Sequence, residues 1–85
     1  MITVRFLSGL ERRLGFSESC YVYEGPAPVS FRSLCEQLNI HGLDTINKPL
    51  LINCLGKTFA LDKAYSELDI PDGETVIMFM INGGG

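Results

Sequence analysis

The residues best suited to chemistry stand at the end of the sequence, where the apolar run MFMI is followed by Asn82, Gly83, Gly84 and Gly85. Glycine adopts backbone angles that other residues avoid and has no side chain, so this segment could enter a channel too narrow for a Cβ atom. Fully extended, it would reach about 13 Å at about 3.3 Å per residue. A carboxylate on Gly85 becomes an acyl donor once it attacks the α-phosphate of ATP, because sulfur or an amine can then attack the acyl-adenylate. The tail is therefore predicted to present its carboxylate to another protein's active site.

The other reactive side chains predict no catalytic site. His41 stands alone in a polar loop and is expected to be solvated. Four carboxylates surround the Pro-Asp-Gly turn before the last apolar run, and although a general acid–base pair could form there, charges beside such a turn are expected to be solvated. They are Glu67, Asp69, Asp72 and Glu74. The three glycines are not a phosphate loop, since no helix follows them.

The three cysteines, Cys20, Cys35 and Cys54, are odd in number and far apart. They form neither a C-x-x-C pair nor a zinc-ligand spacing. We expect three reduced, partly buried thiols, with no disulfide, no metal site and no cofactor.

Composition narrows the classes of partner. The 85 residues suit one domain, with 46% apolar residues and a net charge of -3. Lys and Arg are scattered, so no basic stripe predicts nucleic-acid binding. No apolar run approaches the ~20 residues that would span a membrane. The start, MITVRF, lacks a signal-peptide pattern, so we expect a cytoplasmic protein.

Periodicity predicts the elements that position the tail. Strands are expected at 2–7 and 18–25, paired as a hairpin, and then at 49–56, 57–61 and 75–81. Ser30 is the expected N-cap of the one clear helix, whose apolar face is Phe31, Leu34, Cys35 and Leu38 and which ends at Asn39 or Gly42. Single helical turns are expected within 8–15, 39–48 and 63–68.

These elements predict an α+β fold, with a mixed sheet of four to five strands and one main helix on one face. Residues 1–81 are expected to form the domain, and residues 82–85 are expected to be a flexible tail. The last strand is expected beside the first, with Val76, Met78 and Met80 on one face and Ile77, Phe79 and Ile81 on the other. One helix covers one face, so the second set is expected to bind a partner unless a loop covers it or the second helical turn is longer than the sequence indicates.

Four stretches together resemble the ubiquitin-like β-grasp sulfur carriers, and they span nearly the whole chain: ITVRFLSGLERRLG, VSFRSLCEQL, LLINCLGK and LDIPDGETVIMFMINGGG. The most specific part is the turn at Asp72 and Gly73, followed by an acidic and apolar strand and by Gly84 and Gly85 at the family's interval. The small subunit of molybdopterin synthase is the most similar member type, and the thiamine-pathway carrier is close kin. The long connection SGLERRLGFSE favours the molybdopterin branch. Met80 and Ile81, where that branch often has prolines, and the triple glycine favour the thiamine branch.

The resemblance implies a non-catalytic sulfur carrier. A ubiquitin-activating-like enzyme would adenylate Gly85, and a sulfur donor enzyme would convert the adenylate to a thiocarboxylate. The carrier would deliver this sulfur to the large subunit of molybdopterin synthase or to another sulfur-accepting enzyme. The sheet face near Phe79 and Ile81 would dock on these partners.

Three other functions remain open on the sequence. A ubiquitin-like modifier that is conjugated to lysines would begin with the same tail chemistry. A plant-type ferredoxin shares the β-grasp architecture, but its C-x₄-C-x₂-C pattern is absent. A plain interaction module, with glycines of no consequence, is the fourth reading.

Overall fold

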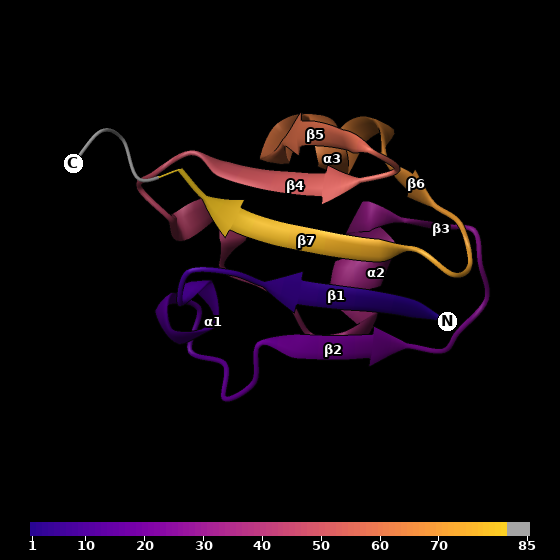
Figure 1. The fold of residues 1–85 in the computed structure, drawn as a ribbon, viewed down its shortest axis with the longest axis horizontal. Coiled ribbons are helices and arrows are strands. Elements are labelled where there is room, and N and C mark those ends of the chain that lie inside the picture. The colour runs from indigo at the N-terminus through magenta and orange to yellow at the C-terminus, as the bar shows by residue number, and fades with distance from the viewer. Residues whose placement is uncertain (82–85) are drawn as a thin grey trace.

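The computed structural model describes residues 1–81, whose framework is a five-stranded sheet in the order β2-β1-β7-β4-β5 (Figure 1). β1 and β7 run parallel, and every other neighbouring pair is antiparallel. The sequence-based prediction of an α+β fold with a mixed sheet is confirmed. The strands are β1 (Ile2–Phe6), β2 (Cys20–Tyr23), β4 (Leu50–Cys54), β5 (Lys57–Ala60) and β7 (Thr75–Met80).

The last strand occupies the centre of the sheet, as its composition predicts. β7 is hydrogen-bonded to β1 on one side and to β4 on the other. Its alternate side chains Val76, Met78 and Met80 are buried, whereas Ile77 and Phe79 are half-buried. A strand with hydrogen-bonded neighbours on both sides exposes no edge, so β7 needs none of the charged residues that protect edge strands.

The main helix, α2 (Phe31–Gln37), begins and ends where capping rules place it. The Ser33 N–H donates to the Ser30 Oγ at 3.1 Å, which satisfies a free donor of the first turn. At the other end Asn39 takes a positive φ of 56°, and the Ile40 N–H donates to the Cys35 carbonyl at 2.8 Å. The helix buries its expected apolar face: Phe31, Leu34 and Cys35, with Leu38 half-buried.

Three shorter helical elements accompany α2. They are α1 (Leu10–Arg13), the 3-10 turn η1 (Leu43–Thr45) and α3 (Leu61–Glu67). The expectation of a single turn over 63–68 was wrong, because α3 has seven residues and begins at Leu61. Leu61, Ala64, Tyr65 and Leu68 have the same helical spacing as the buried face of α2. The fold therefore has two amphipathic helices rather than one.

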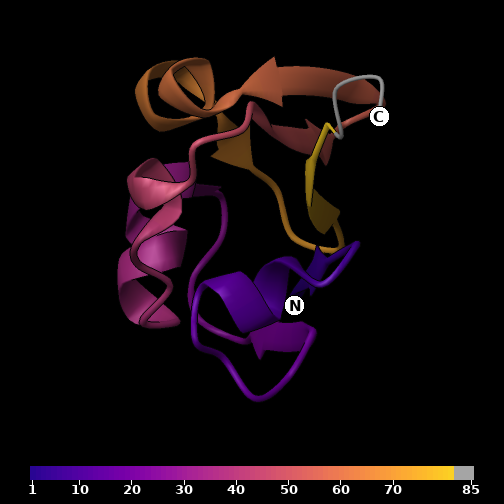
Figure 2. The ribbon, with the colours of Figure 1, turned by 90° about the vertical axis from the view of Figure 1, so that its left-hand side faces the viewer.

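Both amphipathic helices lie on the same side of the sheet. In Figure 2, α2, η1 and α3 stand together on that side. Their buried residues pack against the inward residues of the strands, including Ile2, Val4, Ile52 and Met78, which are all 0% exposed. On the opposite side, no helix of residues 1–81 lies over the sheet (Figure 2). The second amphipathic helix, α3, thus adds to the helical layer that already contains α2, and the other side of the sheet stays uncovered.

A two-stranded pairing that periodicity did not predict connects the two layers. β3 (Val29–Ser30) pairs antiparallel with β6 (Asp69–Ile70). The Phe31 N–H also donates to the Leu68 carbonyl at 2.9 Å. These bonds tie the start of α2 to the segment that leads from α3 into β7.

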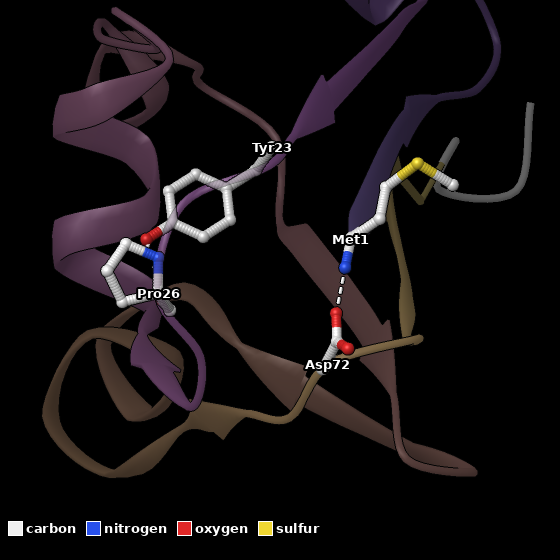
Figure 3. A network of polar contacts seen from close by, with 4 residues as sticks. All are labelled: Met1, Tyr23, Pro26 and Asp72. Carbon is white, nitrogen blue, oxygen red and sulfur yellow. Dashed lines mark hydrogen bonds and ion pairs between the residues drawn. The ribbon is translucent and has the colours of Figure 1, made fainter.

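Three polar contacts hold the loops at the end of the sheet where β1 and β7 begin, and Figure 3 draws the residues of two of them, Met1 with Asp72 and Tyr23 with Pro26. The Met1 amine forms an ion pair with Asp72, and the Gly73 N–H donates to the Met1 carbonyl at 2.8 Å. The Tyr23 hydroxyl donates to the Pro26 carbonyl at 2.7 Å. The predicted turn at Asp72 and Gly73 is therefore present, with Gly73 at a φ of 88° that favours glycine.

Candidate functional site

The uncovered side of the sheet, here the open face, is assigned from strand register and burial. Residues that are paired across neighbouring strands share a face of the sheet. Side chains alternate between the two faces along each strand, so the residues of the open face are those that lie between the buried ones. The pairs Arg5–Cys20, Arg5–Ile77, Ile77–Asn53 and Phe79–Leu51 run across it. Its strand positions are Thr3, Arg5, Cys20, Val22, Leu51, Asn53, Thr58, Ala60, Thr75, Ile77 and Phe79.

The centre of the open face is apolar. Ile77, Phe79 and Leu51 are half-buried there, although no helix of residues 1–81 packs on them. Ile81 follows the strand and is 46% exposed, and Val22 on the edge strand is 49% exposed. The structure therefore brings together all three residues predicted to bind a partner: Ile77, Phe79 and Ile81. It adds Leu51, which the sequence analysis missed because its position beside Phe79 depends on the β4–β7 register.

The end of β7 is held on both sides, where the chain leads towards the tail. The Leu7 N–H donates to the Met78 carbonyl, and the Ile81 N–H donates to the Pro49 carbonyl at 3.1 Å. The predicted tail, residues 82–85 with Gly83, Gly84 and Gly85, lies outside the described residues. Within residues 1–81, the chain leaves the central strand of the sheet at Ile81, beside the open face.

The thiols differ in accessibility. Cys35 and Cys54 are 3% and 1% exposed, but Cys20 is exposed. The expectation of partial burial was therefore wrong for Cys20, because its position in the edge strand β2 faces away from the core. Burial raises the pKa of the Cys35 thiol to about 12. Burial, with the nearby charge of Glu74, raises the pKa of the Cys54 thiol to about 11. Neither buried thiol is a nucleophile at neutral pH, since only the thiolate attacks.

Three of the four carboxylates near the last turn, Glu67, Asp72 and Glu74, have different polar partners. Glu74 is half-buried and accepts the Leu55 N–H at 3.3 Å and the Cys54 thiol at 3.7 Å. Glu67 pairs with Lys63 at 3.7 Å, one helical turn away. The expectation that all four are simply solvated was wrong for Glu74, which joins the start of β7 to the β4–β5 turn.

Among the hollows in the surface of residues 1–81, two adjoin α3, and the only thiol that lines either of them, Cys35, is 3% exposed with a pKa that burial raises to about 12. The larger, about 390 Å³, is lined mainly by aliphatic side chains of η1, β4 and α3. The other, about 290 Å³, lies between α2, α3 and the loop at His41. There the Arg32 guanidinium stacks 4.7 Å from the Tyr65 ring centroid, and exposed His41 lies edge-on to Phe16 at 6.0 Å. These are packing contacts, so the open face and the end of β7 are the stronger candidate site.

Comparisons with protein-family models, curated proteins and solved structures found no match for this chain. In the part of the chain that the structure describes, no helix combines the length and apolarity needed to cross a bilayer. Among the same residues, no group of three or more His, Cys, Asp or Glu side chains is arranged to hold a metal ion.

Proposed function

We propose that the chain is a β-grasp sulfur carrier whose terminal carboxylate, on Gly85, is converted to a thiocarboxylate. The observation that carries the proposal is the position of β7. A central strand, held by β1 and β4, leads past the open face directly into Asn82 and the three glycines. The parallel β1–β7 pair and the helices on one side of the sheet support the β-grasp part of the proposal.

The proposed reaction takes place in partner enzymes. A carboxylate oxygen of Gly85 attacks the α-phosphate of ATP in a ubiquitin-activating-like enzyme, and pyrophosphate leaves. A sulfide equivalent from a sulfur donor enzyme then attacks the carbonyl of the acyl-adenylate, and AMP leaves with the oxygen. The thiocarboxylate sulfur then attacks an electrophilic carbon of the acceptor, and water cleaves the acyl–sulfur bond, which leaves the sulfur on the acceptor and regenerates the carboxylate. The chain supplies the acyl group and a docking surface, and it needs neither a catalytic residue nor a cofactor of its own.

The open face supports the docking part of the proposal. Ile77, Phe79 and Leu51 remain partly accessible, and an uncovered apolar sheet centre is typical of a surface that binds a protein. Molybdopterin biosynthesis, with the large synthase subunit as the acceptor, is the proposed pathway. Thiamine biosynthesis, or that of another sulfur-containing metabolite, is the alternative.

Mass spectrometry tests the function directly. Intact mass first establishes that the protein isolated from its own cells ends at Gly85. Incubation with the adenylating enzyme, ATP and the sulfur donor should then add about 16 Da, because sulfur replaces one oxygen. Omission of ATP and deletion of Gly84 and Gly85 should each abolish the gain. An unchanged mass in the complete reaction would refute the proposal.

The competing functions give different results in the same experiment. A protein modifier would form high-mass conjugates that disappear when the target lysines are replaced. A plain interaction module would keep its activity without Gly84 and Gly85 but lose it when Phe79 is replaced. If the sulfur of the thiocarboxylate is isotopically labelled, the molecule that receives the label would identify the pathway.

A further inference from the structure

Arg5 is the only charged residue among the strand positions of the open face. Val4 and Phe6 on either side of it in β1 are buried, so Arg5 points away from the core. Its register partners on this face are Cys20 on β2 and Ile77 on β7. The side chain is exposed, and neither ion pair recorded within residues 1–81 involves it. A guanidinium without an ion pair to any of residues 1–81 therefore borders the apolar centre of the sheet.

This arrangement contrasts with the rest of the chain. The sequence has 10 acidic against 7 basic residues, yet none of the acidic residues occupies a strand position on the open face. The neighbouring polar positions, Thr3, Asn53, Thr58 and Thr75, carry no charge. The local charge of this surface is thus opposite in sign to the net charge of -3.

We propose that the protein covering the open face presents a carboxylate to Arg5 and apolar side chains to Ile77 and Phe79. A partner that covered the guanidinium without an acceptor would leave a charge desolvated and unpaired, which is costly. A carboxylate can accept two parallel N–H bonds from the planar guanidinium, which fixes the orientation of the partner as well as adding affinity. The inference deepens the proposed function, on which it rests for the identity of the partner, by specifying the chemistry of the partner's surface.

The opposing explanation is that Arg5 only keeps copies of the protein apart. Charged residues on exposed strands prevent uncovered sheet surfaces from associating. In that case, removal of the charge would promote self-association of the chain and leave partner binding unchanged. The two explanations therefore differ in what a neutral residue at this position does.

Steady-state kinetics of the adenylating enzyme, with the chain as substrate, tests the proposal. Arg5→Gln is expected to raise KM about tenfold or more with little change in kcat, because a hydrogen-bonded charge pair is lost. The KM of Arg5→Lys should lie between those of the wild type and Arg5→Gln, since lysine keeps the charge but lacks the planar guanidinium that binds a carboxylate through two N–H groups. The wild-type KM should rise with salt more steeply than that of Arg5→Gln.

Lys57→Gln is the matched control. Lys57 is also an exposed cation on a strand, but its register partner is the buried Cys54, which places it on the opposite side of the sheet. Its replacement removes the same charge and should change KM less than twofold. Equal effects of the two variants would overturn the inference. So would an Arg5→Gln variant that self-associates in analytical ultracentrifugation while its KM stays at the wild-type value.

If the wild-type chain is not activated at all, the proposed function fails, and a probe that needs no partner decides the inference. Indole-3-acetate and its neutral amide are titrated against the isotopically labelled protein and followed by NMR. The acetate should shift the amides of Arg5, Ile77 and Phe79 at about two- to fivefold lower concentration than the amide compound. Arg5→Gln should remove this difference. Equal titration of the wild type by both compounds would overturn the inference.

Discussion

Stability at alkaline pH should depend on the buried thiol of Cys35. In the unfolded chain this thiol has its ordinary pKa of 9.0, whereas burial raises the pKa to about 12 in the folded protein. Below pH 9 both states keep the proton. Between pH 9 and 12 the unfolded state loses the proton that the folded state retains, so the free energy of unfolding falls as the pH rises. By pH 10 this loss amounts to about 1 kcal/mol, at about 1.4 kcal/mol for each unit of pKa difference that has been crossed.

The measurement is urea unfolding of wild type and Cys35→Ala at pH 8 and pH 10. Tyrosines and lysines also titrate in this range, so the informative quantity is the difference between the two proteins. The variant should lose about 1 kcal/mol less stability than the wild type on going from pH 8 to pH 10. Leu34→Met, a substitution at a buried neighbour without a thiol, should keep the wild-type pH dependence. Cys54, whose pKa is also raised, acts in the same direction in all three proteins.

An equal loss of stability in the two proteins would refute the reasoning. If wild type and Cys35→Ala lost the same stability, the thiol would ionise as readily in the folded as in the unfolded state. The assignment of Cys35 to a dry core would then be wrong, and a thiolate would be available for sulfur chemistry. Alkylation in native buffer gives a second reading, since Cys35 should react at least about a thousandfold more slowly than the same thiol in urea at pH 8.

Four further substitutions test the fold. Leu55 adopts a φ of 58° in the β4–β5 turn, where asparagine is preferred, so Leu55→Asn should stabilise the protein by about 1 kcal/mol, and an unchanged urea midpoint would contradict this. A Cβ atom on Gly25 would lie 2.6 Å from the Tyr23 hydroxyl, so Gly25→Ala should displace that ring and cost about 1–2 kcal/mol, read as a lower Tm. Met78→Ala should cost about 2–5 kcal/mol and Phe79→Ala about 1 kcal/mol in urea unfolding, because only Met78 is fully buried; equal costs would mean that the open face is packed in solution.

Local patterns predicted the parts of the fold that obey a single period. Ile2, Val4 and Phe6 alternate in β1, and the apolar face of α2 repeats at helical spacing, so both elements were predicted correctly. The start of α3 was missed although Leu61 and Ala64 fit the helical spacing, because Leu61 also continues the pattern of the preceding strand. β3 and β6 have two residues each, and no periodicity can identify a strand of that length.

The residues of the candidate site also include some that a local pattern predicts and some that only the pairing of distant strands reveals. Ile77, Phe79 and Ile81 were predicted from the alternation along one strand. Leu51 and Arg5 join them only through pairing with β7, and register between distant strands is set by the packing of the whole core. Glu74 was expected in solvent because its contacts with Cys54 and Leu55 cross from one hairpin to another strand.

The central position of β7 also explains how a small domain could serve a tail. An edge strand is bonded on one side only and frays more easily than a strand between two neighbours. β7 pairs with β1 over four residue positions and with β4 over four, and Ile81 is bonded to Pro49 beyond the last strand residue. A force that a partner applied to the segment after Ile81 would therefore act against the hydrogen bonds of both strand pairs, β1–β7 and β4–β7, at the same time. The same two neighbours hold Ile77 and Phe79 level with Arg5 and Leu51, so the proposed docking on the open face and the proposed presentation of the tail would both depend on one strand. Replacement of Met78 in the core should consequently impair both, whereas replacement of Phe79 should impair docking and leave the sheet intact.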